Sequence, residues 1–439
     1  MQSSQQQWSS IQKILFRFFC CFFFIYIFPF PLDSIPFTTE ISLISTKLTA
    51  WYFAIFEAYT NFWHKVIPWV GQHILHLKKP ITIFSNGSGD TTYDYVQLLT
   101  YFFLALLATI LWTSIDRNRK SYNTIYFWLR VWVRYYLVAI FLIYGFIKIF
   151  HLQMPSPFLS QLVQPFGDKS PMGLAWSFVG YSKAFSAFTG WGEVIAGLFI
   201  FFRRTATLGA LAGIIVMGNI VAINFCYDVP VKLFSSMLWI MCVCLVVPDI
   251  DRLIKIFFLN KSTQPVDISF KLNKKWQRVT RLILKWTFIL YSLYSNISQN
   301  IKSQKEYGDA MPKINLYGIY NTVTVMRNHD TLPPLDTDTT RWKQLIVQFE
   351  KYSMVKMMND SFRVYNFIID TVSKKATVYP TSDTLNKSIF NYQSDAVYLT
   401  LTGKIKKDSI YMRFKKIDIN SFRLLSRGFN WINEYPYNR

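Results

Sequence analysis

Charge is scarce in this chain, and acidic residues are the scarcest kind. Asp, Glu, Lys and Arg make up 16% of the 439 residues, whereas hydrophobic residues make up 51% and aromatic residues 18%. This composition indicates a membrane protein. The 47 basic residues outnumber the 25 acidic ones. Because they gather in loops between apolar runs, they indicate orientation in a membrane, and we predict no nucleic-acid partner.

Cysteine is also rare, and the motifs of resident cofactors are missing. The polar C-terminal third has no cysteine, which excludes a disulfide framework there. The five cysteines lie in or beside apolar runs, where we interpret them as inert buried thiols. We find no Walker loop, dinucleotide-binding fingerprint, CxxCH haem attachment, nucleophile elbow or paired-histidine haem helix.

Long apolar runs are abundant. A helix needs about 20 residues to cross a bilayer, and this length predicts about seven transmembrane helices, at about 14–31, 95–112, 131–150, 184–202, 205–225, 231–249 and 282–298. No small-residue cleavage site follows the first run, so we predict that it stays uncleaved. The aromatic-rich stretch around 51–75 suits a helix that lies at the membrane interface.

The basic residues predict the orientation of these helices. The sequence RNRK at 117–120, Arg203 with Arg204, and the basic segment 250–281 all fall on one side if seven helices cross. The opposite loops are poor in Lys and Arg. The positive-inside rule therefore places the N-terminus in the cytoplasm and everything after about residue 298 outside. For a bacterial cell this means a multi-pass inner (plasma) membrane protein with a periplasmic C-terminal domain.

Residues 299–439 read as a separate polar domain rich in strands. Apolar and polar residues alternate in segments such as NTVTVMR, RVYNFIID and AVYLTLTGKI, with turn residues between them. This pattern predicts an antiparallel β barrel or sandwich. The opening segment LYGIYNTV is similar to the glycine–aromatic first strand of lipocalin-like barrels. The predicted divisions are thus 1–130, a core at 131–250, a basic loop with the seventh helix at 251–298, and the β domain at 299–439.

The predicted core carries two short patterns, R…GxxK and GxxE. They are formed by Arg134, Gly145 and Lys148, and by Gly190 and Glu193, with AGLFIFFRRTATLGAL after the second. Over 131–250 the chain resembles the DoxX-like membrane proteins, and its flanking parts resemble extended members of the Bacteroidetes type. The resemblance implies a four-helix membrane core. Because the family takes its name from a subunit of a terminal quinol oxidase, it also hints at a quinone as cofactor or substrate.

Charged side chains inside the predicted core are the candidates for chemistry. A carboxylate at the depth of Glu193 is costly unless it is protonated, paired or facing a cavity, so it either handles protons or holds helices together. Lys148 lies on one face with Gly145, which would let another helix approach. It is either a cation for a ligand or a lysine that reaches the interface. We predict that Lys148 and Glu193 face one bundle interior and share a polar network with Asn224 and Asp228.

Other polar residues are weaker candidates. Asp228 stands just before Val229 and Pro230, where helix N-capping explains it best, and it is also a candidate catalytic group. The candidate binding residues are Arg134, Asn219, Asn224, Lys232, His73 and His76. The two histidines would share a helix face, but no second ligand motif supports a metal, and we predict none.

Two hypotheses remain open, and whether the chain is an enzyme is undecided. In the first it is a quinone- or lipid-linked membrane redox protein or subunit, with Lys148, Glu193 and Asp228 at the reacting end. In the second it is a non-catalytic membrane scaffold or transport accessory, whose periplasmic β domain binds a protein or lipid partner. The missing cofactor motifs favour the second, and the buried charges and the family resemblance favour the first.

Overall fold

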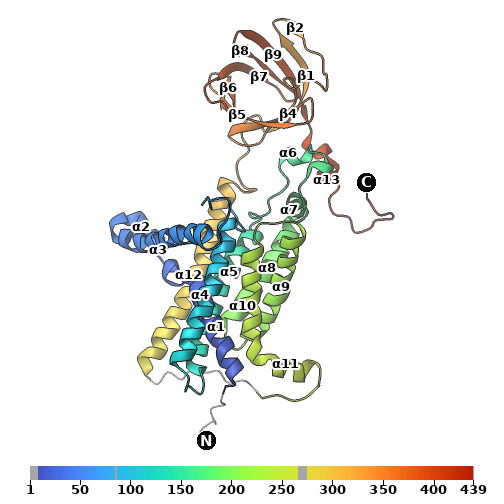
Figure 1. Ribbon diagram of the computed structural model, residues 1–439. Helices are drawn as coiled ribbons and strands as arrows, with labels where there is room; N and C mark the ends of the chain where they lie inside the picture. Colours follow the sequence, from blue (N-terminus) through green and yellow to red (C-terminus); the bar gives the residue numbers. More distant parts are fainter. Residues whose placement is uncertain (1–7, 85–86, 265–273, 439) are drawn as a thin grey trace. The chain divides into compact units, whose positions relative to one another are not determined.

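The computed structural model describes residues 8–84, 87–264 and 274–438. The chain forms two compact units, one helical and one built around a β sheet (Figure 1). The helical unit takes Met1–Met154 and Pro171–Gln304, and the β unit takes Pro155–Ser170 and Lys305–Arg439.

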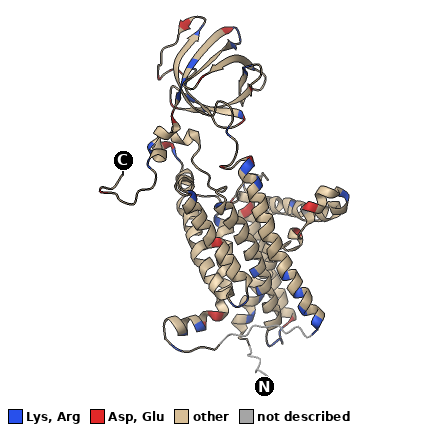
Figure 2. Cartoon of the chain, turned by 180° about the vertical axis from the view of Figure 1, so that it is seen from behind, with Lys and Arg blue, Asp and Glu red and all other residues tan. Residues whose placement is uncertain are grey.

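Six helical segments of the first unit are long and apolar enough to cross a membrane, so the chain is a helical multi-pass membrane protein with a β domain. Their helices are α1 (Ser10–Ile27), α4 (Thr92–Ile115), α5 (Asn123–Ile149), α8 (Lys183–Phe201), α9 (Ala206–Cys226) and α10 (Lys232–Val246), which continues towards α11 (Ile250–Phe257). Figure 2 shows these helices almost free of charge along their length, with many basic residues near the end of the bundle where α1 begins.

The predicted seventh helix forms as part of α12 (Lys275–Glu306), which is more polar than the six spans. Its Phe288 contacts Tyr135 of α5 at 5.0 Å between ring centroids. Sixteen residues later, the side chain of Gln304 donates to the backbone oxygen of Phe150. From the first contact to the second, the residue number rises along both helices. Helix α12 therefore runs parallel to α5 along most of its length. Residues 265–273 of the predicted basic segment lie outside the described residues.

Local sequence signals explain several helix starts. Thr91 and Asp94 form the capping box that the sequence predicts at the start of α4, with each side chain bound to the other's backbone nitrogen. Ser9 and Gln12 do the same for α1. The stretch predicted as interfacial forms α2 (Thr38–Ile44) and α3 (Thr46–His73), and α3 lies across the long helices instead of along them (Figure 1).

The β unit is a closed antiparallel barrel of eight strands. The strands are β1 (Gly318–Arg327), β3 (Trp342–Val347), β4 (Lys351–Met357), β5 (Phe362–Asp370), β6 (Lys375–Pro380), β7 (Ser388–Ser394), β8 (Tyr398–Ile405) and β9 (Asp408–Ile417), with β2 (Asp330–Thr331) hairpinned onto β1. They pair in chain order, and β9 closes onto β1. This is the up-and-down arrangement that lipocalins also use. Of the two predicted architectures, the barrel is the one formed.

The barrel is packed with its own side chains. Along β8 and β9, alternate residues such as Leu399, Leu401, Met412 and Phe414 are buried in one apolar cluster. Large aromatics from other strands, including Trp342, complete it. The alternation visible in the sequence is therefore the inward and outward alternation of the strands.

The boundary predicted between the core and the β domain differs from the observed one. Residues 155–170, assigned to the core at 131–250, belong to the β unit. Leu159 of the short helix α6 (Leu159–Leu162) is buried against Ile319 and Ile346. Its backbone nitrogen also donates to the side chain of Gln348 at 2.8 Å. Three prolines break up this segment, and it has no regular apolar pattern from which its contact with the barrel could be predicted.

Candidate functional site

The site begins with a close contact between α5 and α8. A Cβ placed on Gly190 would lie 2.5 Å from the backbone oxygen of Gly145, and one on Gly145 would lie 2.6 Å from Cγ2 of Val194. Such separations leave no room for a side chain at either position. The two glycines of the GxxK and GxxE patterns therefore allow the two backbones to touch.

This contact brings Lys148 and Glu193 together. Lys148 Nζ forms an ion pair with Glu193 Oε1. The two side chains are 7% and 2% exposed. Ser186 of α8 adds a hydrogen bond from its hydroxyl to the backbone oxygen of Lys148, at 2.9 Å. The predicted pairing of these two charges inside the bundle is therefore observed.

The ion pair lines a large cavity within the helical unit. The cavity has a volume of about 950 Å³ and is surrounded by residues of α4, α5, α7 (Pro171–Tyr181), α8, α9 and α10. Most of the lining is apolar or aromatic, including Phe141, Trp176 and Trp191. An apolar chamber with a few convergent polar groups is typical of binding sites for small molecules.

Asn219 and Asn224 of α9 line the same cavity. Asn224 is buried and donates to the hydroxyl of Ser235 at 2.9 Å, which links α9 to α10. Neither asparagine is hydrogen-bonded to the ion pair in any contact that we observe. Instead of one continuous network, the described residues form two polar groups on one chamber.

Asp228 lies elsewhere, and its predicted role as an N-cap is wrong. Its side chain is 85% exposed and accepts from Lys232 Nζ at 2.8 Å. The start of α10 is capped by Asp90, whose two carboxylate oxygens accept from the backbone nitrogens of Lys232 and Leu233 at 2.6 and 3.0 Å. Because Asp90 comes from a loop 142 residues earlier, no local pattern identifies it as the cap.

Three further predicted binding residues do not line the cavity. Arg134 donates to the backbone oxygens of Ile200 and Phe201 at 2.9 Å, so it satisfies the carbonyls at the end of α8. His73 ends α3 and stacks on Trp69, and His76 lies beyond the helix with a φ of 49°. The two histidines therefore do not share one helix face. Within the described residues, no group of three or more His, Cys, Asp or Glu side chains is placed to hold a metal.

Other polar residues of the cavity were not predicted from the sequence. Gln97 and Tyr101 of α4 line it and are hydrogen-bonded to each other at 2.9 Å, and Tyr144 of α5 lies one turn before Lys148. Tyr144 and Lys148 are four residues apart, so their shared helix face was a usable signal. The contribution of α4 was not predictable in this way, because it depends on how α4 packs.

Taken together, the fold defines a multi-pass helical membrane protein with a β-barrel domain and a buried ion pair on a large internal chamber. The chain is 31% identical to the uncharacterized protein YwoB of Bacillus subtilis (strain 168) over 143 residues, which cover 30% of this chain and 82% of YwoB. It therefore belongs to the same family as YwoB. No family model matches the chain, and no solved structure matches it.

Proposed function

We propose that this chain is a DoxX-like integral membrane protein that binds a quinone, or a lipid-soluble molecule with a similar carbonyl head, in the cavity beside Lys148. The proposal rests on one observation: a buried Lys–Glu pair opens onto a largely apolar chamber of about 950 Å³. An apolar chamber suits the ring and tail of such a ligand. The ammonium group of Lys148 is a strong hydrogen-bond donor for its carbonyl oxygen.

The same pair suits a redox role as a subunit. Reduction of a quinone takes two electrons and two protons and yields a quinol. Lys148 would stabilise the negative charge that develops on one quinone oxygen, and Glu193 would give that oxygen its proton. Water would supply the proton of the second oxygen. The electrons would come from a partner protein that carries a redox centre. Asp228, exposed and outside the cavity lining, has no part in this step.

We also propose the bacterial inner membrane as the location, with the N-terminus in the cytoplasm and the β unit in the periplasm. The gathering of basic residues at one end of the helices supports it. The parallel course of α12 and α5 supports a seventh crossing. Reporter fusions at Arg439 test the topology: a periplasm-active reporter should work there, and activity of a cytoplasmic reporter alone would contradict it.

A non-catalytic role as a scaffold or transport accessory is the second candidate. It is favoured by an apolar row on the outside of the barrel. Ile368, Thr377 and Ile389 are direct neighbours across β5, β6 and β7. The two isoleucines are 44% and 59% exposed. Exposed apolar residues side by side on a barrel wall offer a contact for a protein or lipid partner.

Quinone content of the purified protein distinguishes these functions. The wild-type chain, extracted in mild detergent, should retain quinone after purification and bind added menadione. Lys148→Met should weaken menadione binding by about tenfold or more, because a hydrogen bond from a charged group contributes about 1.5–3 kcal/mol. Lys120→Met, which changes an exposed lysine between α4 and α5, is the matched control.

Two results would count against quinone binding. One is a wild-type protein that neither retains quinone nor binds menadione. The other is equal binding by wild type and Lys148→Met. If either result is found while Ile389→Asp abolishes capture of a periplasmic partner, the scaffold function is the better explanation.

A further inference from the structure

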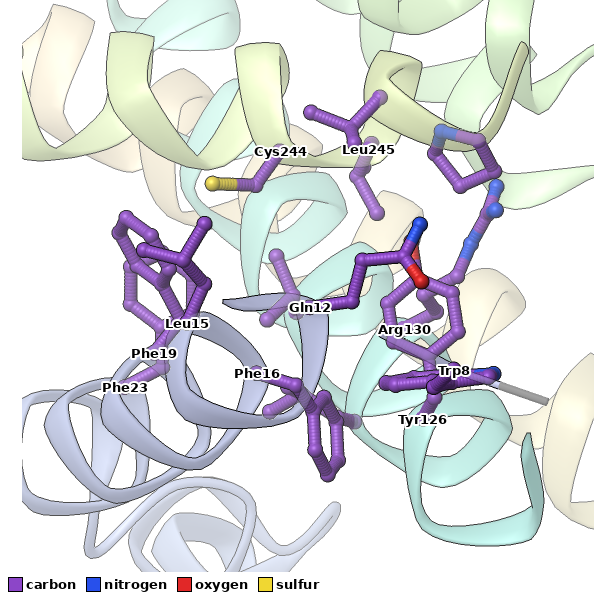
Figure 3. A pocket seen from close by; sticks show the side chains of 14 residues that line it. Trp8, Gln12, Leu15, Phe16, Phe19, Phe23, Tyr126, Arg130, Cys244 and Leu245 are labelled. Atoms are coloured by element: carbon purple, nitrogen blue, oxygen red, sulfur yellow. The ribbon is translucent and has the colours of Figure 1, made fainter. Parts of the chain in front are cut away.

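A second, smaller cavity lies between α1, α5 and the end of α10, away from the Lys148 pair. It has a volume of about 420 Å³. Figure 3 shows its lining: side chains of α1, among them Leu15 and Phe19, face Cys244 and Leu245 of α10, with Arg130 of α5 beside them. It lies near the end of the bundle where both α1 and α5 begin, because Trp8 donates to Asn123 at 2.9 Å.

Among the described residues that line this cavity, Arg130 is the one that carries a charge. Its Nη1 atom is buried and has no hydrogen-bond partner among the described residues. The guanidinium lies 5.8 Å from the ring centre of Tyr126, which supports the cation but does not neutralise it. A buried donor of a charged group without an acceptor is costly, so an external anion would satisfy it.

The nearby carboxylate does not neutralise Arg130. Asp249 follows directly on Pro248 of the lining, but its carboxylate binds other side chains and forms no ion pair with Arg130 among the described residues. One of its oxygens accepts from Thr207 at 2.6 Å and the other pairs with Arg252 at 2.5 Å. Arg130 therefore has no carboxylate partner among the described residues at the edge of this apolar cavity.

Arg130 lies in the first third of α5, near one edge of the hydrocarbon core. It stands seven residues after the first residue of the helix, about 10 Å along an element about 40 Å long. If the helix is centred on a hydrocarbon core about 30 Å thick, Arg130 lies about 5 Å inside the edge of that core, from where the long arginine side chain reaches the headgroups. Trp8 and Tyr126 beside it are the residue types that gather at the membrane interface. Basic pockets between transmembrane helices are suited to anionic headgroups.

We propose that this cavity binds one anionic glycerophospholipid, with its phosphate on Arg130 and an acyl chain between α1 and α10. The half-buried guanidinium of Arg130 supplies the selectivity for a net negative headgroup. The apolar walls select a molecule with an acyl chain over a free phosphate ion. This site is separate from the proposed quinone cavity, and its test does not depend on that function.

Native mass spectrometry of the full-length protein, reconstituted with phosphatidylglycerol or phosphatidylcholine and then stripped with detergent, tests the proposal. The wild type should keep one phosphatidylglycerol, and phosphatidylcholine should be lost. Arg130→Gln should retain phosphatidylglycerol about tenfold less, because a charge-assisted contact is removed. Arg204→Gln, at an exposed arginine between α8 and α9, should retain it as the wild type does.

Two further variants separate lipid binding from folding. Arg130→Lys keeps the charge and should keep the lipid. Leu15→Trp narrows the apolar part and should lose the lipid although Arg130 is intact. If Arg130→Gln does not fold, these two variants decide the outcome. Equal retention in all variants, equal retention of both lipids, or capture of phosphate without acyl chains would overturn the proposal.

Discussion

Lys148 and Glu193 show how the cost of buried charge shapes this protein at the scale of single residues. Each side chain is almost fully buried in an apolar bundle, where an isolated charge would be strongly unfavourable. Pairing offsets part of the desolvation cost but does not make the pair a large source of stability. The ion pair therefore explains how both charges are tolerated inside the bundle.

The first prediction concerns this pair. Lys148→Met or Glu193→Gln alone should lower the free energy of unfolding by about 3–5 kcal/mol, because the remaining partner is left buried and unpaired. The double variant Lys148→Met with Glu193→Gln should be less harmful than either. Thermal unfolding in detergent measures all three, with Lys120→Met as the control. Strictly additive effects would mean that the two residues do not interact energetically.

Residue chemistry alone predicted part of this site. Lys148 and Glu193 could be predicted because charge is conspicuous inside an apolar run. The contacts of Asp228 could not be predicted in this way. An Asp shortly before a proline has the sequence pattern of an N-cap whether or not its side chain turns towards the helix. To predict Asp90 as the actual cap, one would have to know which loop lies over the start of α10.

At the scale of elements, the contact between α5 and α8 sets the position of the ion pair. The two helices run antiparallel, so that Gly145 meets Gly190 and Arg134 meets the end of α8. Helix ranges were predictable from apolar length. The choice of neighbouring helices was not, because every apolar face is equally suited to lipid and to protein. The small residues were the available clue.

The second prediction tests this contact. Gly190→Ala places a methyl group against the backbone of α5, since its Cβ would lie 2.9 Å from the nitrogen of Ile149. Backbone atoms cannot rotate away as a side chain can. We expect a loss of about 1–3 kcal/mol, typical of overpacking, and separation of Lys148 from Glu193. Unfolding in detergent measures the loss.

Gly218→Ala is the matched control for this substitution. It also lies in a membrane helix, but its new methyl group would meet the Trp239 side chain at an ordinary 3.5 Å. It should therefore change stability little. Equal effects of the two substitutions would show that the loss comes from general helix perturbation and not from the α5–α8 contact.

At the scale of the whole molecule, the segment between α5 and α7 joins the two units. It leaves the helical unit after Met154, packs on the barrel and returns at Pro171. The helix that carries Lys148 thus leads directly into this segment, residues 155–170, which we call the strap. The change in composition predicted a separate β domain at 299–439, but residues 155–170 were assigned to the core at 131–250. Only three-dimensional packing reveals the partner of the strap, since Leu159 and Ile346 are far apart in the chain.

The last prediction concerns the strap, residues 155–170. Residues 305–439 should fold alone into a barrel, because its interior is filled by its own apolar side chains. Without the strap, however, Ile319 and Ile346 lose the cover that Leu159 provides. A synthetic peptide of residues 155–170 should therefore bind the isolated barrel and raise its melting temperature, since burial of a leucine side chain contributes about 1.5–3 kcal/mol.

Circular dichroism of the barrel with and without peptide measures this effect. A peptide with Leu159→Ala should stabilise the barrel much less, because it keeps the backbone bond to Gln348 but loses the apolar contact. A peptide with Gln164→Ala, whose side chain bonds within the strap itself, is the control and should act like the natural one. If the natural peptide leaves the melting temperature unchanged, the strap is held by its covalent connections and not by affinity for the barrel. Helix α5 would then have no energetic connection to the β unit through it.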